Sequence, residues 1–183
     1  MGIAELWMPI LVSSIIVFVM SALVWMVLPW HKSDFKKAAN EDALRAALKG
    51  AGVGYYMLPY CTSTAELKDE ALAQKYVEGP QAFITVVPNG MPKMGAKLLL
   101  SFFYYVGVGI LCAYMLSRTI VADAPYLEIF RVVGTTAFIA HGVAFVQDSI
   151  WFGRPWSLTT KNLLDALIYG ALTGGTFGWL AQA

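Results

Sequence analysis

The chain has 183 residues, of which 58% are hydrophobic and only 14% are charged, and its formal net charge is +1 at pH 7. A soluble globular domain carries about 25% charged residues, so this composition excludes an ordinary soluble domain and predicts an integral membrane protein. A net charge this close to zero provides no basic face for phosphates, and we therefore expect no nucleic-acid partner.

The first predicted transmembrane helix occupies residues 1–30 and contains an uncharged apolar run from Leu6 to Trp30. A bilayer core about 30 Å thick needs about 20 helical residues, which this run exceeds. A secretory signal peptide does not fit, because Glu5 stands where positive charges are expected and the apolar run is too long. We therefore expect this helix to span the membrane.

Residues 31–97 are polar enough to form an extramembrane insert with a small α/β fold. Two short helices and one strand are predicted within it, at about 41–49, 64–78 and 82–87. Asn40 can cap the first helix, and the strand is bounded by prolines and a Pro-Asn-Gly turn signal. Residues 53–58 can supply its partner strand. A two-stranded unit is only marginally stable alone, so the insert needs cover from its helices, the lipid surface or another protein.

Three further apolar stretches complete the predicted bundle, at residues 98–117, 129–152 and 163–180. The expected fold class is therefore all-α, with four transmembrane helices and a small α/β insert between helices 1 and 2. With four spans, only Arg118 and Arg131 of the 13 lysines and arginines lie on the side of the termini. The positive-inside rule then predicts a cytoplasmic insert and external termini, as in a bacterial inner (cytoplasmic) membrane.

The last predicted span carries small residues at a spacing of four: Ala166, Gly170, Gly174 and Gly178. Small residues at this spacing let a second helix backbone approach closely within a bilayer. Two interpretations remain open: packing between helices of one chain, or contact with another subunit.

His141 is the deepest ionisable residue of the predicted spans, about 15 Å from Arg131 at 1.5 Å per residue. An ionisable group at this depth is expensive and marks a functional hypothesis. Three interpretations stay open for it: a neutral imidazole bonded to a neighbouring hydroxyl, an axial ligand of a haem or chlorophyll-type metal, or a step in proton or solute transfer. The sequence requires no cofactor.

A second polar cluster is expected at the inner interface, formed by Asp148, Arg154, Lys161 and Asp165. Gly153 can end one helix and Ser157 can start the next, so a tight helical hairpin is predicted here. It would bring Asp148, Arg154 and Asp165 together, either as a salt-bridged clamp or as a site for an anionic headgroup or ligand.

No catalytic residue set is evident, and two histidines without metal-ligand spacing predict no metal site. The first functional hypothesis is a non-catalytic accessory or assembly subunit of a larger membrane complex, for which a bioenergetic complex is a natural host. The alternative is a small oligomeric transporter or channel that uses His141 and Asp148 in a proton or solute path. The expected partners are the lipid bilayer and other membrane subunits or a second copy of the chain.

Overall fold

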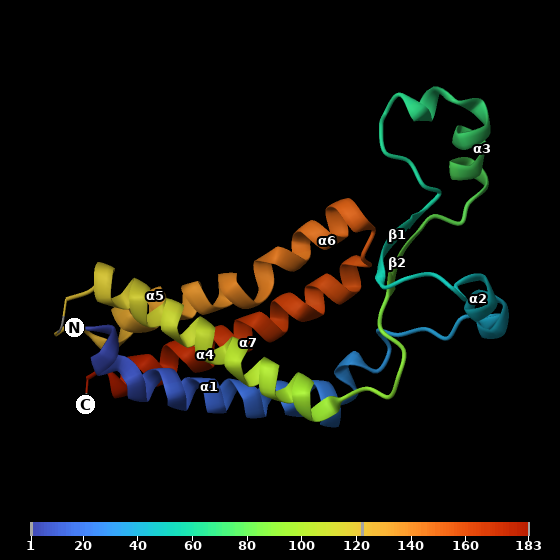
Figure 1. Ribbon diagram of the computed structural model, residues 1–183. Coiled ribbons are helices and arrows are strands. Elements are labelled where there is room, and N and C mark those ends of the chain that lie inside the picture. Colours follow the sequence, from blue (N-terminus) through green and yellow to red (C-terminus); the bar gives the residue numbers. More distant parts are fainter. Residues whose placement is uncertain (1, 122, 183) are drawn as a thin grey trace. The chain divides into compact units, whose positions relative to one another are not determined.

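The structure is a computed structural model that describes residues 2–121 and 123–182 (Figure 1). It divides into a helical unit, residues 1–36 and 93–183, and an insert unit, residues 37–92.

Nine helical segments make up the helical unit, several of them continuous with one another. They are η1 (Ile3–Leu6), α1 (Trp7–Ala22), η2 (Leu23–Val27), η3 (Pro29–His31), α4 (Met94–Thr119), α5 (Tyr126–Phe138), η5 (Ile139–Val143), α6 (Ala144–Phe152) and α7 (Trp156–Leu180) among the residues that are described. η2 and η5 are π-helical turns inside longer helices.

Three of these helices are long and apolar enough to cross a membrane: Ile3–Val27, Met94–Thr119 and Tyr126–Phe152. Three of the four expected spans are therefore helices of sufficient length and apolar content to cross a membrane. α7 has 25 residues, but Lys161, Asp165 and its glycines and threonines make it less apolar, and it is not among the three. A fourth span is not established by length and composition.

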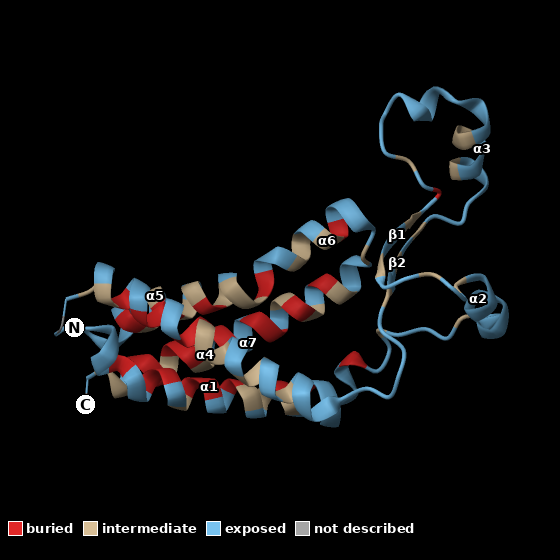
Figure 2. Ribbon diagram, viewed as in Figure 1, coloured by how far each residue is buried: buried red, intermediate tan, exposed pale blue. Residues whose placement is uncertain are grey.

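α7 is the most enclosed helix of the unit and packs against α1, α5, η5 and α6, whereas α4 packs against α1 and α5. Eleven of its 25 residues are buried, compared with five of the 26 residues of α4 (Figure 2). Phe177 of α7 lies in the core with Leu116 and Ile129, and all three are almost fully buried. The lower apolar content of α7 is thus consistent with its surroundings, because most of its polar side chains are buried against other helices.

The insert unit contains two short α-helices and a two-stranded antiparallel sheet. Its elements are α2 (Glu41–Ala47), β1 (Gly54–Leu58), η4 (Glu66–Lys68), α3 (Glu70–Glu78) and β2 (Ala82–Val86). β1 and β2 pair from Gly54–Val86 to Leu58–Ala82. The amide N–H of Ala43 donates to the Asn40 side chain at 3.0 Å, which caps α2.

The segment expected as one helix at about 64–78 consists of the 3₁₀ turn η4 followed by α3. Asp69 has extended backbone angles and accepts a hydrogen bond from the Ala71 amide at 2.9 Å. An aspartate in this conformation caps a new helix, so the chain leaves the helical conformation between the two elements.

Candidate functional site

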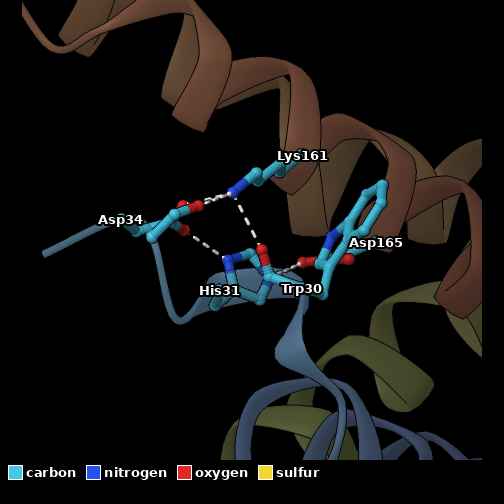
Figure 3. A network of polar contacts seen from close by, with 6 residues as sticks. Trp30, His31, Asp34, Lys161 and Asp165 are labelled. Carbon is cyan, nitrogen blue, oxygen red and sulfur yellow. Dashed lines mark hydrogen bonds and ion pairs between the residues drawn. The ribbon is translucent and has the colours of Figure 1, made fainter.

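A buried polar network connects the end of the first helix to α7, and His31 is its centre (Figure 3). The Nδ1 atom of His31 lies 2.5 Å from Oδ2 of Asp34, and its Nε2 atom lies 2.8 Å from Oδ2 of Asp165. The side chains of all three residues are no more than 5% exposed. The Trp25 ring stacks on the imidazole with a centroid distance of 3.8 Å.

Lys161 adds a cation to this network from α7. Its Nζ atom donates to Oδ1 of Asp34 at 2.5 Å and to the carbonyl of Trp30 at 2.8 Å. Ionised carboxylates only accept hydrogen bonds, so both ring nitrogens of His31 are satisfied when both carry hydrogen. The four side chains are then neutral as a group, and this balance lets charged residues be buried together.

The pKa of Asp34, which lies outside the predicted spans, reflects these contacts. Burial alone raises the pKa of this carboxyl group, but hydrogen bonds from Lys161 and His31 outweigh burial and hold the pKa below its ordinary value of 3.8. Asp34 therefore stays ionised at neutral pH and holds both Lys161 and His31 next to α7.

The predicted inner-interface cluster separates into two parts. Asp148 pairs with Arg154 at 3.4 Å in the turn between α6 and α7, where Gly153 has a left-handed φ of 65°. The Arg154 guanidinium also lies 4.8 Å from the centre of the Phe145 ring. Lys161 and Asp165 instead join His31 and Asp34, so the hydrogen-bond partner of Asp165 is His31, 134 residues away in the chain.

His141 lies in the π-helical turn η5 and is surrounded by aromatic rings. The centroids of Tyr104, Tyr105 and Tyr169 lie 5.5, 5.7 and 5.5 Å from the imidazole centroid. Within the described part of the chain the imidazole makes no hydrogen bond, and the Tyr104 hydroxyl donates to the Ala140 carbonyl at 2.9 Å. π-helical turns occur often at functional sites, so this environment is a candidate site.

A cavity of about 230 Å³ lies between His141 and the His31 network. Its polar lining consists of His141, Asn162, Asp165 and Tyr169, and its other walls are the aromatic side chains of Trp25, Tyr104, Tyr105 and Phe145. Asn162 and Tyr169 are only 5% and 6% exposed. The Asn162 Nδ2 group has no hydrogen-bond partner among the residues described, and the Tyr169 hydroxyl donates to none of them, although the Trp25 indole lies close enough to donate to it. Because buried polar groups are normally paired, these two require an explanation.

The small residues of α7 lie against other helices of the same chain. A Cβ atom built on Gly170 would lie 2.8 Å from the Gly134 carbonyl, and one built on Gly174 would lie 2.8 Å from the Phe130 carbonyl. A Cβ atom built on Gly178 would lie 2.7 Å from the Tyr126 ring. The Cβ of Ala166 lies 2.6 Å from a Cβ atom built on Gly142. In the structure this ridge is occupied by α5 and η5.

The sequence singled out Lys161, Asp165 and His141, but it did not link them to His31, Asp34, Asn162 and Tyr169. His31 and Asp34 have a signal that was available: they are three residues apart, at the same end of the bundle as Lys161 and Asp165. Asn162 and Tyr169 have no sequence signal, because their unpaired state depends on which helices face one another. No group of three or more His, Cys, Asp or Glu residues that could hold a metal ion is found among residues 2–121 and 123–182.

Comparison with other proteins gives no further guidance, since no family model, no curated protein and no solved structure matches this chain.

Proposed function

We propose that this chain is a four-span protein of the bacterial inner membrane that serves as a non-catalytic accessory or assembly subunit of a larger membrane complex. α7 is proposed as the fourth span, because 25 helical residues extend about 37 Å and most of its polar side chains, from Thr159 to Thr176, are buried against protein. Four spans would put the insert unit and the two termini on opposite sides, and the distribution of lysine and arginine supports a cytoplasmic insert and external termini.

The observation that carries this proposal is the lack of a core in the insert unit. Between residues 37 and 92 only Pro59 is buried. Large apolar side chains are exposed instead, for example Tyr60, Val77 and Met91, at 72, 87 and 90%. A two-stranded sheet needs further strands or a covering surface for stability, so a partner subunit is the cover that we propose for this unit.

The proposal is tested by purifying the tagged chain from its native membrane in a mild detergent. We expect the chain to migrate with a larger partner in fixed stoichiometry. Val77→Gln combined with Met91→Gln should release that partner, because both changes remove exposed apolar surface. Glu70→Gln, a polar change on the same unit, is the control and should retain it. Migration as a free chain, or retention of the partner by the double variant, would contradict the proposal.

The alternative, a transport path through His141, has one structural observation in its favour. The cavity beside His141 is lined by Asp165 rather than by Asp148, which pairs with Arg154. A path would therefore use His141 and Asp165. Reconstituted vesicles test it directly: proton or solute flux that is lost in His141→Ala would favour transport, and absence of flux in the unmodified chain would exclude it.

A further inference from the structure

The cavity beside His141 has the size and walls of a small-molecule site. Its volume is about 230 Å³, and a cavity of about 150 Å³ in another protein holds benzene. Four aromatic side chains form the walls, and planar rings pack well against such surfaces in stacked or edge-to-face geometries. One six-membered ring with small substituents would fill this space.

The unpaired polar groups define the chemistry of the occupant. Nδ2 of Asn162 is a hydrogen-bond donor only, and the Tyr169 hydroxyl can donate as well. Each lies on a side chain more than nine-tenths buried, and both line the cavity. Leaving a buried donor unpaired is costly, so the complementary ligand carries acceptor oxygens toward α7.

The charge of the cavity argues for a neutral ligand. Asp165 is the one acidic residue of the lining, and its Oδ2 atom already accepts a hydrogen bond from Nε2 of His31 at 2.8 Å. An aromatic cage with a free carboxylate would attract an ammonium group. Here the carboxylate already has a hydrogen-bond partner in His31, and the unpaired Asn162 amide presents hydrogen atoms that repel a cation.

We propose that this cavity binds a planar, uncharged ring with carbonyl oxygens, the chemistry of a quinone headgroup. Asn162 and Tyr169 donate to the carbonyl oxygens, and the aromatic walls hold the ring. The proposal concerns binding alone and does not depend on whether the chain has a partner subunit.

Two ring compounds of the same shape test the proposal with the full-length chain in detergent. Duroquinone carries two carbonyl oxygens, and durene carries the same four methyl groups without them. Equilibrium dialysis should show duroquinone binding at least tenfold more tightly than durene. The double variant Asn162→Leu with Tyr169→Phe should lose this preference. Comparison with this variant in the same detergent also corrects for uptake of each compound by the micelle. Thr160→Ala, an exposed position on the same helix, should keep it.

The stability of the ligand-free variants separates a binding role from a structural one. If the Asn162 amide serves a ligand, Asn162→Leu leaves the Tm unchanged or raises it, because an unpaired buried group is removed. If the amide is structural, the Tm falls. Equal binding of durene and duroquinone, binding of neither compound above the double variant because the cavity holds only water, or tighter binding of tetramethylammonium would each overturn the proposal.

Discussion

The two units of this chain treat polar and apolar groups in opposite ways. The helical unit buries His31, Asn162 and Asp165 and exposes many large apolar side chains, while the insert unit exposes both kinds. In hydrocarbon, polar groups are satisfied only inside the bundle, and apolar surface faces lipid without cost. The insert unit has neither a buried core nor an apolar surface that faces lipid within the helical bundle, and this contrast is the basis of the proposal that a partner subunit covers it.

The largest effect is expected from breaking the buried network of the helical unit. Asp165→Ala leaves His31 and Lys161 with one carboxylate, and removing one partner of a buried ion pair costs about 3–5 kcal/mol. Denaturation of the detergent-solubilised chain measures this loss. Glu78→Ala, an exposed acid of the insert unit, should change the free energy of unfolding by less than about 0.5 kcal/mol. Equal losses for the two variants would remove the contrast between the units.

An intermediate effect is expected at the contact between α7 and α5. Gly174→Ala places a Cβ atom 2.8 Å from the Phe130 carbonyl oxygen, and overpacking of this kind costs about 1–3 kcal/mol. Gly107 on α4 has no atom within 4 Å of the corresponding position, so Gly107→Ala is the matched control and should be nearly neutral. The same denaturation assay compares them, and a neutral Gly174→Ala would show that this contact is loose.

A pH-dependent effect is expected from Asp34. Its pKa is lower in the folded chain than the ordinary 3.8, so the unfolded chain binds more protons in this range and stability rises with pH. The contribution of Asp34 is full above its unfolded pKa and is lost as the pH falls through the lowered folded value. The Tm difference between the unmodified chain and Asp34→Asn should therefore shrink below about pH 4. A difference that grows on acidification would contradict the contacts described.

The smallest effect is expected from removing apolar surface in the insert unit. Val77 is 87% exposed, so Val77→Gln should change the stability of the isolated chain by no more than about 0.5 kcal/mol. Thermal unfolding of the purified chain measures this change. A loss comparable with that of a core substitution would show that Val77 is already covered within the chain.

Hydrophobicity and spacing predict local features of this chain well. The apolar stretches beginning near Leu6, Leu98 and Ile129 are the parts of the three helices that can cross a membrane. The capping role of a residue such as Asn40 is predictable from local sequence, because capping depends on the next few residues. Such features need no knowledge of which helices touch.

Features that depend on which helices contact one another could not be predicted from hydrophobicity and spacing. Asp165 was expected near Arg154, which is close in sequence, but its partner is His31, 134 residues away. The partner of Asp165 depends on which helix faces α7 at this position, and the residue pattern of a single helix does not specify which helix lies next to it. The same holds for Asn162 and Tyr169, whose unpaired groups become visible only in the folded bundle.

The crossing of α7 is tested most directly by labelling intact cells with a membrane-impermeant maleimide. Cys61 lies in the insert unit, and Cys112 is fully buried, so Gln182→Cys combined with Cys61→Ser gives a single accessible thiol at the C-terminus. Four spans predict that Gln182→Cys is labelled in intact cells, whereas Cys61 of the unmodified chain is labelled only after permeabilisation. Labelling of both thiols under the same condition would place the C-terminus and the insert on one side, and would contradict the four-span account.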